Sequence, residues 1–193
     1  AVERLESAAL YQRYAAMRTA VGNVRGGNPN ERLLWHAAPP PHLAGLADVG
    51  FAGAKLRSEG PAAFGYGFYF AADPRLADLW HAKAGGVDSS AERCVVLARV
   101  SCGSVAARDP LPELDKTAMA KELDRLDNQM APPGSHSASG ADRTEAVVYK
   151  DHMAYPEYVV RYTLAAAPLD VEWPRAGGGS SSLLKLDEVT AAL

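Results

Sequence analysis

Apolar residues at helical spacing open the chain, and short apolar runs follow. The segment from Glu3 to Val21 is rich in Ala, Glu, Arg and Leu, which predicts an amphipathic helix stopped by Gly22. The apolar positions on its expected buried face are Leu10, Tyr14, Met17 and Val21. The run from Arg32 to His36 predicts a short strand that ends at the imidazole, just before a group of prolines.

The next part of the chain predicts a short helix, a long loop and a second strand. The helix is expected over His42 to Val49, and the loop over Phe51 to Gly65 has the length of a functional loop. A strand is predicted over Gly67 to Ala71. Asp73 followed by Pro74 is a typical helix start, so Trp80 is expected on a helix that faces back over this strand.

Longer apolar patterns dominate the second half. The nearly continuous apolar run from Arg93 to Gly103 predicts a central strand covered on both faces. A helix is expected over Met119 to Met130, and a loop over the polar run from Pro132 to Arg143. Two strands then follow, Glu145 to Lys150 and Tyr158 to Leu164, joined in hairpin fashion through residues 154–156.

The length and composition predict one globular domain with an appendage. The 193 residues contain 48% hydrophobic and 22% charged residues, as in ordinary soluble proteins. The folded domain is expected over residues 1–165. Residues 166–193 are expected to form a tail with a flexible Gly and Ser linker at 177–182, and the domain to be part of a longer protein.

Charge and cysteine usage narrow the function classes. A net charge of −3 argues against general binding to the nucleic-acid backbone, and no apolar run approaches the roughly 18 residues of a membrane helix. Cys94 and Cys102 lie too far apart along one predicted strand to pair. They are expected to be buried thiols in a reducing intracellular compartment, the cytoplasm or nucleus.

Three residues on separate predicted strands carry the candidate chemistry: His36, Tyr69 and Glu145. One sheet could bring them together. A histidine at a strand end is more often structural than functional, and Tyr69 between two phenylalanines is most simply a core aromatic. Glu145 at the start of an apolar strand is the hardest of the three to explain by packing alone.

Five motifs in order give these residues a context: LLWHA, the Gly50 and Phe51 pair, FGYGFYFA, PPGSHSASG and EAVVYKDHMAYPEYVVRY. With this pattern the chain resembles poly(ADP-ribose) polymerase catalytic domains over roughly Glu3 to Leu164, and the tankyrase branch most of all. The resemblance implies an α+β fold of two packed antiparallel sheets with peripheral helices, the ADP-ribosyltransferase fold, with NAD in the cleft between the sheets.

The resemblance also implies roles for individual residues. His36, Tyr69 and Glu145 would form the catalytic set. His36 would hydrogen-bond the adenosine ribose, the backbone of Ala37 would bind the nicotinamide carboxamide, and Tyr69 and Trp80 would cover the two faces of the nicotinamide ring. Two further residues are implied to line the NAD site, Ala71 and Ala77.

Elementary chemistry supports these implied roles. Aromatic faces suit a cationic pyridinium, and a carboxylate such as Glu145 would stabilise the positive ribose that develops when the glycosidic bond breaks. NAD would then be a consumed substrate, and ADP-ribose would pass to a protein acceptor, the chain itself included. Mono-transfer is favoured slightly over polymer formation.

Three departures from the family pattern fall near the expected nicotinamide site. Ala37 and Ala38 replace the usual Gly and a small hydroxyl residue, and Ala77 replaces a second hydroxyl residue. The loss of two hydrogen bonds predicts an NAD affinity lower by one or two orders of magnitude. His81 and Cys94 alone correspond to the zinc site of the tankyrase branch, so no metal is expected.

Two other functions remain open on the sequence. The three alanines also fit a domain that binds NAD or ADP-ribose with weak or no catalysis. The third reading is transfer of ADP-ribose to a terminal phosphate of a nucleic acid, which the acidic net charge disfavours.

Overall fold

The computed structural model describes all residues except 39, 44, 54–63, 86–91, 111–130 and 164–193. The described strands are β1 Val2–Arg4, β2 Glu31–Ala37, β3 Phe68–Ala71, β4 Arg93–Ser101, β5 Val105–Ala107, β6 Ser137–Ser139, β7 Glu145–Val148 and β8 Ala154–Tyr162. The described helices are α1 Ala8–Asn23, α2 Leu46–Gly53 and α3 Pro74–Gly85, with short 3-10 helices η1 Pro40–Leu43 and η3 Asp151–Met153. No helix among these residues is long and apolar enough to cross a membrane.

The strands form one mixed sheet in the order β1-β8-β4-β2-β3-β7-β6-β5. Every neighbouring pair is antiparallel except β5 with β6. The predicted α+β class is confirmed. The middle of this sheet is narrow, because β2 and β3 pair only at Trp35 and Ala71. The two packed sheets implied by the resemblance stay a prediction.

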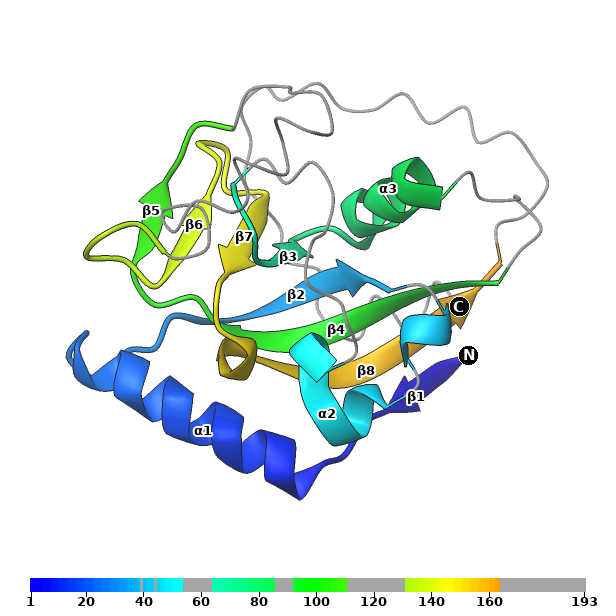
Figure 1. Ribbon diagram of the computed structural model, residues 1–193, viewed down its shortest axis with the longest axis horizontal. Helices are drawn as coiled ribbons and strands as arrows, with labels where there is room; N and C mark the ends of the chain where they lie inside the picture. Colours follow the sequence, from blue (N-terminus) through cyan, green and yellow to red (C-terminus); the bar gives the residue numbers. More distant parts are fainter. Residues whose placement is uncertain (39, 44, 54–63, 86–91, 111–130, 164–193) are drawn as a thin grey trace.

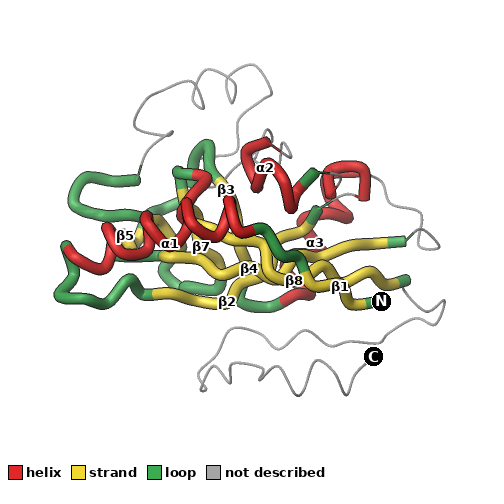
Figure 2. The backbone as a smooth tube through the Cα atoms, turned by 90° about the horizontal axis from the view of Figure 1, so that it is seen from below, coloured by secondary structure: helices red, strands yellow, loops and turns green. Residues whose placement is uncertain are grey.

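Helices cover the sheet from opposite sides (Figure 1). A buried core of Leu34, Phe51, Phe68, Phe70 and Val96 joins α2 to the strands, and Met17 of α1 packs against it. Figure 2 shows α1 lying across the strands. The other face carries a smaller cluster, and α3 contributes Ala77 and Trp80 to it. Both faces of β4 are therefore buried, as its continuous apolar sequence predicted.

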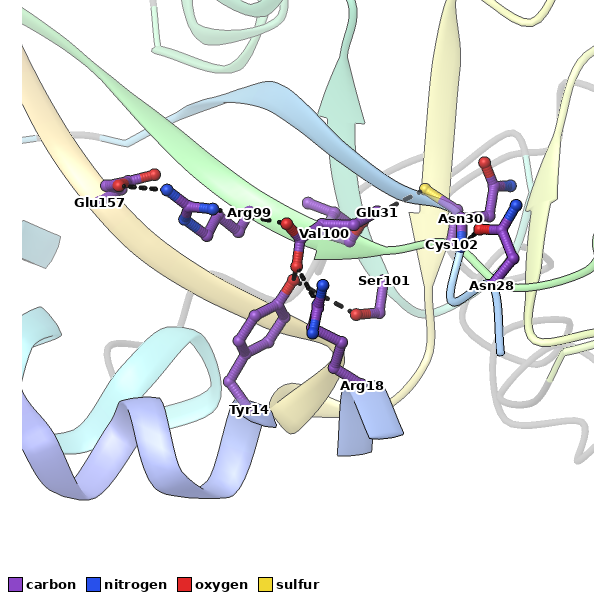
Figure 3. A network of polar contacts seen from close by, with 10 residues as sticks. All are labelled: Tyr14, Arg18, Asn28, Asn30, Glu31, Arg99, Val100, Ser101, Cys102 and Glu157. Atoms are coloured by element: carbon purple, nitrogen blue, oxygen red, sulfur yellow. Dashed lines mark hydrogen bonds and ion pairs between the residues drawn. The ribbon is translucent and has the colours of Figure 1, made fainter. Parts of the chain in front are cut away.

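A polar network fixes α1 to the strands beside it (Figure 3). The Tyr14 hydroxyl donates a hydrogen bond of 2.6 Å to Glu31 on β2, and Arg18 pairs with the same carboxylate at 2.6 Å. Arg99 on β4 joins Glu31 to Glu157 on β8, with separations of 3.4 and 2.8 Å. Four elements therefore share one network of charges.

Several sequence predictions are confirmed. Leu10, Tyr14 and Val21 are buried on α1, and the expected strands at β2, β3, β4 and β7 are present. The start of α3 is as predicted, because the Asp73 carboxylate accepts a hydrogen bond of 2.8 Å from the backbone N–H of Arg75. Cys94 and Cys102 are buried free thiols.

Three predictions about local structure are wrong. The first helix begins at Ala8 rather than Glu3, because residues 2–4 pair with β8 as β1. The polar run before Glu145 contains β6. Residues 154–156 belong to β8 and do not form a hairpin connection, since β8 pairs with β1 and β4. Pro156 is tolerated because it pairs with Ala98 at a register shift, where the ladder is already interrupted.

Three expectations lie outside the described residues. They are the helix over 119–130, most of the loop over 51–65, and the tail over 166–193 with its linker. The boundary expected after residue 165 also falls there.

Candidate active site

His36, Tyr69 and Glu145 lie on three strands that are neighbours in the sheet, β2, β3 and β7. One sheet therefore brings them together, although more than a hundred residues separate the first from the last. Their spacing across the sheet is set by register: Glu145 pairs with Ala71, and Ala71 pairs with Trp35. Directly paired residues in antiparallel strands point to the same face. Glu145 consequently shares the face covered by α3.

Five of the six predicted NAD-binding residues gather on that face, and His36 is the exception. Ala71 and Ala77 belong to a buried cluster against which Ala37 and Trp80 pack. Tyr69, two residues before Ala71 on β3, faces the same side because side chains alternate along a strand. Ala71 and Ala77 have no exposed surface, so a ligand that touches them must displace a neighbour. Trp80 is the largest partly buried neighbour on α3.

The rings of Tyr69 and Trp80 meet at a right angle. Their centroids are 6.4 Å apart and their planes differ by 89°. The resemblance implied that the two aromatic rings lie parallel, one on each face of the nicotinamide. In the structure the two rings are perpendicular and form a corner. A planar group could lie on one ring and meet the edge of the other, which keeps one stacking contact of about 0.5–1.5 kcal/mol.

The hydroxyl group of Tyr69 is fully used within the protein. It accepts a hydrogen bond of 2.9 Å from the backbone N–H of Phe64 and donates one of 2.6 Å to the carbonyl oxygen of Gly65. The carbonyl oxygen of Phe64 in turn accepts bonds from the Tyr149 hydroxyl at 2.7 Å and from Arg108 at 3.2 Å. Burial raises the pKa of Tyr69. The hydroxyl therefore orients the ring, and only the ring is left for binding.

Gly67 brings β3 close to β7 just before this tyrosine. A Cβ atom at position 67 would lie 2.6 Å from Val147 and 2.9 Å from the carbonyl oxygen of Val148. The absence of a side chain at Gly67 therefore allows a close approach of one strand to the next.

His36 points to the opposite face from Tyr69 and Glu145. Its side chain is 6% exposed, and its ring packs against Phe51 and Phe70 with centroid separations of 5.4 Å each. Nδ1 lies 2.7 Å from the carbonyl oxygen of Tyr69, so Nδ1 carries the proton and donates it. Burial lowers the pKa of His36 to about 4, and the imidazole is neutral near pH 7. The structure joins the three residues on adjacent strands but on two faces.

The backbone of Ala37 lies beyond the ladder between β2 and β3. The N–H of Ala38 bonds to Cys94 on β4 at 3.4 Å, so by alternation the N–H and C=O of Ala37 point the other way, toward β3. After Trp35 and Ala71, the next pair would be Ala37 with Tyr69, yet the Tyr69 carbonyl is taken by the imidazole. Within the described residues, the Ala37 amide lies past the end of the ladder.

Glu145 begins β7 with a half-buried side chain. Burial, and then the nearby charge of Asp142, raise the pKa of its carboxyl group. No hydrogen bond or ion pair joins this carboxylate to another described residue, whereas its backbone carbonyl accepts a bond of 2.6 Å from Ser139. The carboxylate is available to a ligand on the face that carries Tyr69.

The three alanines that depart from the family pattern are not equivalent. Ala77 is fully buried in the cluster under α3, on the same face as Tyr69. Ala38 is fully buried on the other face, in the core with Phe51 and Phe70. A hydroxyl at position 38 would therefore point away from Tyr69 and Glu145. Of these two positions, 77 is the one that could supply a side-chain hydrogen bond to a group held there.

Several residues that support the site had no signal in the sequence. Ser139, Arg108 and Tyr149 act through backbone atoms of Glu145 and Phe64, and such contacts follow from the tertiary structure rather than from a motif. The ring of His136, just before β6, accepts a hydrogen bond of 3.1 Å from the backbone N–H of Ser104. In the part of the chain that the structure describes, no group of His, Cys, Asp and Glu could hold a metal. No protein-family model matches the chain.

Proposed function

We propose that this protein is an ADP-ribosyltransferase that cleaves NAD, releases nicotinamide and transfers ADP-ribose to a protein side chain. The observation that carries the proposal is Glu145, a half-buried carboxylate free of described partners on the same sheet face as the Tyr69 ring. The resemblance to poly(ADP-ribose) polymerase catalytic domains supplies the reaction.

In this reaction the nicotinamide ring lies on Tyr69 in the corner closed by Trp80. The N–H and C=O of Ala37 match the C=O and N–H of the carboxamide. The bond between the ribose carbon and the ring nitrogen breaks, and nicotinamide leaves as a neutral molecule. Glu145, bonded to a ribose hydroxyl, stabilises the positive charge that exists on the ribose only in the transition state.

The acceptor completes the transfer. Its nucleophilic atom forms the new bond to the ribose carbon and gives up a proton to Glu145 or to solvent. A raised pKa makes Glu145 a better proton acceptor than an ordinary surface carboxylate.

In this proposal the role of His36 differs from the role that the resemblance implied. Its imidazole holds the Tyr69 carbonyl and so keeps the Ala37 amide free for the carboxamide. A hydrogen bond to the adenosine ribose would have to come from the opposite face of the sheet, through Nε2. The two-sheet ADP-ribosyltransferase fold is supported by the narrow junction at Trp35 and Ala71, which divides the strands into two groups of four.

Labelled NAD tests the proposal directly. The wild type is expected to release nicotinamide and to label itself or an added protein, predominantly with single ADP-ribose units. Glu145→Gln keeps the shape of the side chain and is expected to lower the rate by about 10²–10³-fold, the usual cost of one transition-state contact. Glu6→Gln, at a carboxylate whose side chain is 72% exposed, is the control. Equal labelling by wild type and Glu145→Gln would remove Glu145 from the reaction.

A second candidate is a module that binds NAD or ADP-ribose without turning it over. The right angle between Tyr69 and Trp80 and the buried Ala77 favour it, because both weaken a nicotinamide site. Calorimetry with NAD and with ADP-ribose separates the candidates. Binding of either ligand without nicotinamide release, unchanged by Glu145→Gln, would establish the binding module.

A further inference from the structure

Ser139 contacts the backbone of Glu145, the residue that carries the proposed catalytic carboxylate. It is the last residue of β6, is 1% exposed, and its hydroxyl oxygen is 2.6 Å from the backbone carbonyl oxygen of Glu145. The carbonyl oxygen of Gly140 is farther away, at 3.1 Å. Because one hydroxyl has one proton, the shorter contact to Glu145 is the principal hydrogen bond.

This hydrogen bond joins β6 to β7 just beyond the end of their backbone ladder. The ladder between β6 and β7 has two pairs, Ser137 with Val148 and Ala138 with Val147. On its other side, Glu145 is held by pairing with Ala71 on β3. The Ser139 hydroxyl is therefore the support of Glu145 on the β6 side.

The backbone of Ser139 is itself fixed from the outer strand. The N–H of Arg108, just after β5, donates a hydrogen bond of 2.9 Å to the Ser139 carbonyl. The guanidinium of Arg108 reaches the Phe64 carbonyl at 3.2 Å, and the Phe64 N–H holds the Tyr69 hydroxyl. The hydroxyl of Ser139 thus belongs to a hydrogen-bonded network that also orients the tyrosine.

We propose that Ser139 is a positioning residue for Glu145: its hydroxyl fixes the first residue of β7 and thereby aims the carboxylate at the ribose. This inference rests on the proposed ADP-ribosyl transfer. Small displacements of a catalytic group are costly, since a shift of about 1 Å can lower a rate by roughly a hundredfold. The substrate gains no direct contact with Ser139.

Ser137 provides a matched control on the same strand. It is 0% exposed, and its hydroxyl donates a hydrogen bond of 2.7 Å to the carbonyl oxygen of Cys102. Ser137→Ala and Ser139→Ala each remove one buried hydroxyl and leave one backbone carbonyl without that donor. Only the second change affects the backbone of Glu145.

The test compares nicotinamide release, NAD affinity by calorimetry and the melting temperature in Ser139→Ala, Ser137→Ala and Ser139→Thr. Ser139→Ala is expected to lower kcat by roughly ten- to a hundredfold, with an NAD affinity within about twofold of the wild type. Ser137→Ala is expected to keep kcat within about twofold of the wild type. It is expected to lower the melting temperature about as much as Ser139→Ala does. Ser139→Thr, which keeps the hydroxyl, is expected to restore most of kcat.

Two results would overturn the positioning role. The first is an equal effect of Ser139→Ala and Ser137→Ala on kcat. The second is a loss of NAD affinity in Ser139→Ala as large as its loss of kcat, which indicates collapse of the site. A wild type that releases no nicotinamide, or a fully active Glu145→Gln, contradicts the proposed reaction instead.

Discussion

The imidazole of His36 donates a hydrogen bond of 2.7 Å to the carbonyl oxygen of Tyr69, at the place where the next backbone pair between β2 and β3 would form. A side-chain hydrogen bond therefore replaces a backbone hydrogen bond between the two strands. The bond requires the Nδ1–H form of the ring, and burial against Phe51 and Phe70 opposes a positive charge there.

His36 is expected to give the protein a pH-dependent stability. Its folded-state pKa is lowered to about 4, whereas the unfolded chain binds a proton near 6.5, so the unfolded state carries more protons between these values. The free energy of unfolding then falls as pH drops from about 6.5 to 4, by up to about 3 kcal/mol. Urea unfolding across this range measures it.

The matched variants for that experiment are His36→Gln and His42→Gln, which replace a buried and an exposed histidine. His36→Gln is expected to be less stable at pH 7 and to lose this part of the pH slope. His42→Gln is expected to keep it. Parallel curves for the wild type and His36→Gln would contradict the buried neutral imidazole.

Asp142→Asn is expected to move the acid limb of activity to lower pH. Asp142 raises the pKa of Glu145, and the reaction requires the ionised carboxylate, so removal of the neighbouring charge lowers the pH at which activity is lost. Asn keeps an oxygen that can accept from the N–H of Thr144, a contact of 3.3 Å with Asp142. The pH profile of kcat/KM for nicotinamide release measures the shift, and Asp48→Asn on α2 is the control. A shift toward higher pH would exclude this electrostatic coupling.

Tyr69→Phe separates the hydroxyl from the ring. The change removes the bonds to Phe64 and Gly65 and leaves a buried N–H without its acceptor, which costs about 1–3 kcal/mol of stability. The ring face remains, so NAD affinity is expected to change far less than in Tyr69→Ala. Chemical denaturation and calorimetry on both variants check this.

Tyr149→Phe is the companion variant, because the Tyr149 hydroxyl bonds to the other side of Phe64 at 2.7 Å. Its loss of stability is expected to be smaller, because the Phe64 carbonyl keeps the hydrogen bond from Arg108, and NAD affinity is expected to be preserved. An NAD affinity that falls as much in Tyr69→Phe as in Tyr69→Ala would assign the hydroxyl, rather than the ring, to binding.

Ala77→Ser is expected to strengthen NAD binding. In the proposed complex the ligand displaces a neighbour that covers Ala77, and a hydroxyl at this position would then bond the carboxamide and add about 0.5–1.5 kcal/mol, up to roughly tenfold in affinity. Ala38→Ser introduces the same group into the opposite core and is expected to lower stability without any gain in affinity. Calorimetry with NAD compares the two. Equal affinities in both variants would mean that the carboxamide is not held at α3.

The sequence predicted those elements whose pattern has a simple physical cause. Asp73 and Pro74 specify the start of α3, and the unbroken apolar run of β4 requires burial on both faces. β6 escaped prediction because its serines are polar, and they become buried only where carbonyl groups of Cys102 and Glu145 accept from them. Short strands such as β1 depend on pairing with distant residues and carry little pattern of their own.

The sequence predicted that the three candidate residues lie on strands, but not which face of the sheet each side chain takes. The predicted strands identified His36, Tyr69 and Glu145 as candidates, and the strand order in the structure makes their three strands neighbours. Which face each side chain takes depends on register, and the register at Trp35 and Ala71 puts His36 on the far side. The right angle between Tyr69 and Trp80 depends in the same way on how α3 packs, which residue spacing does not specify.

The single rung between β2 and β3 makes this sheet depend on what fills its middle. In the backbone ladder, two groups of four strands are joined by one residue pair and one imidazole, and a shared core that includes Leu34, Phe68 and Val96 packs across the junction. Amide hydrogen exchange should accordingly be fastest along this seam and slow on either side of it. A dinucleotide that binds the Ala37 amide and lies on the Tyr69 ring would bridge β2 and β3, so substrate binding is expected to slow hydrogen exchange along this seam.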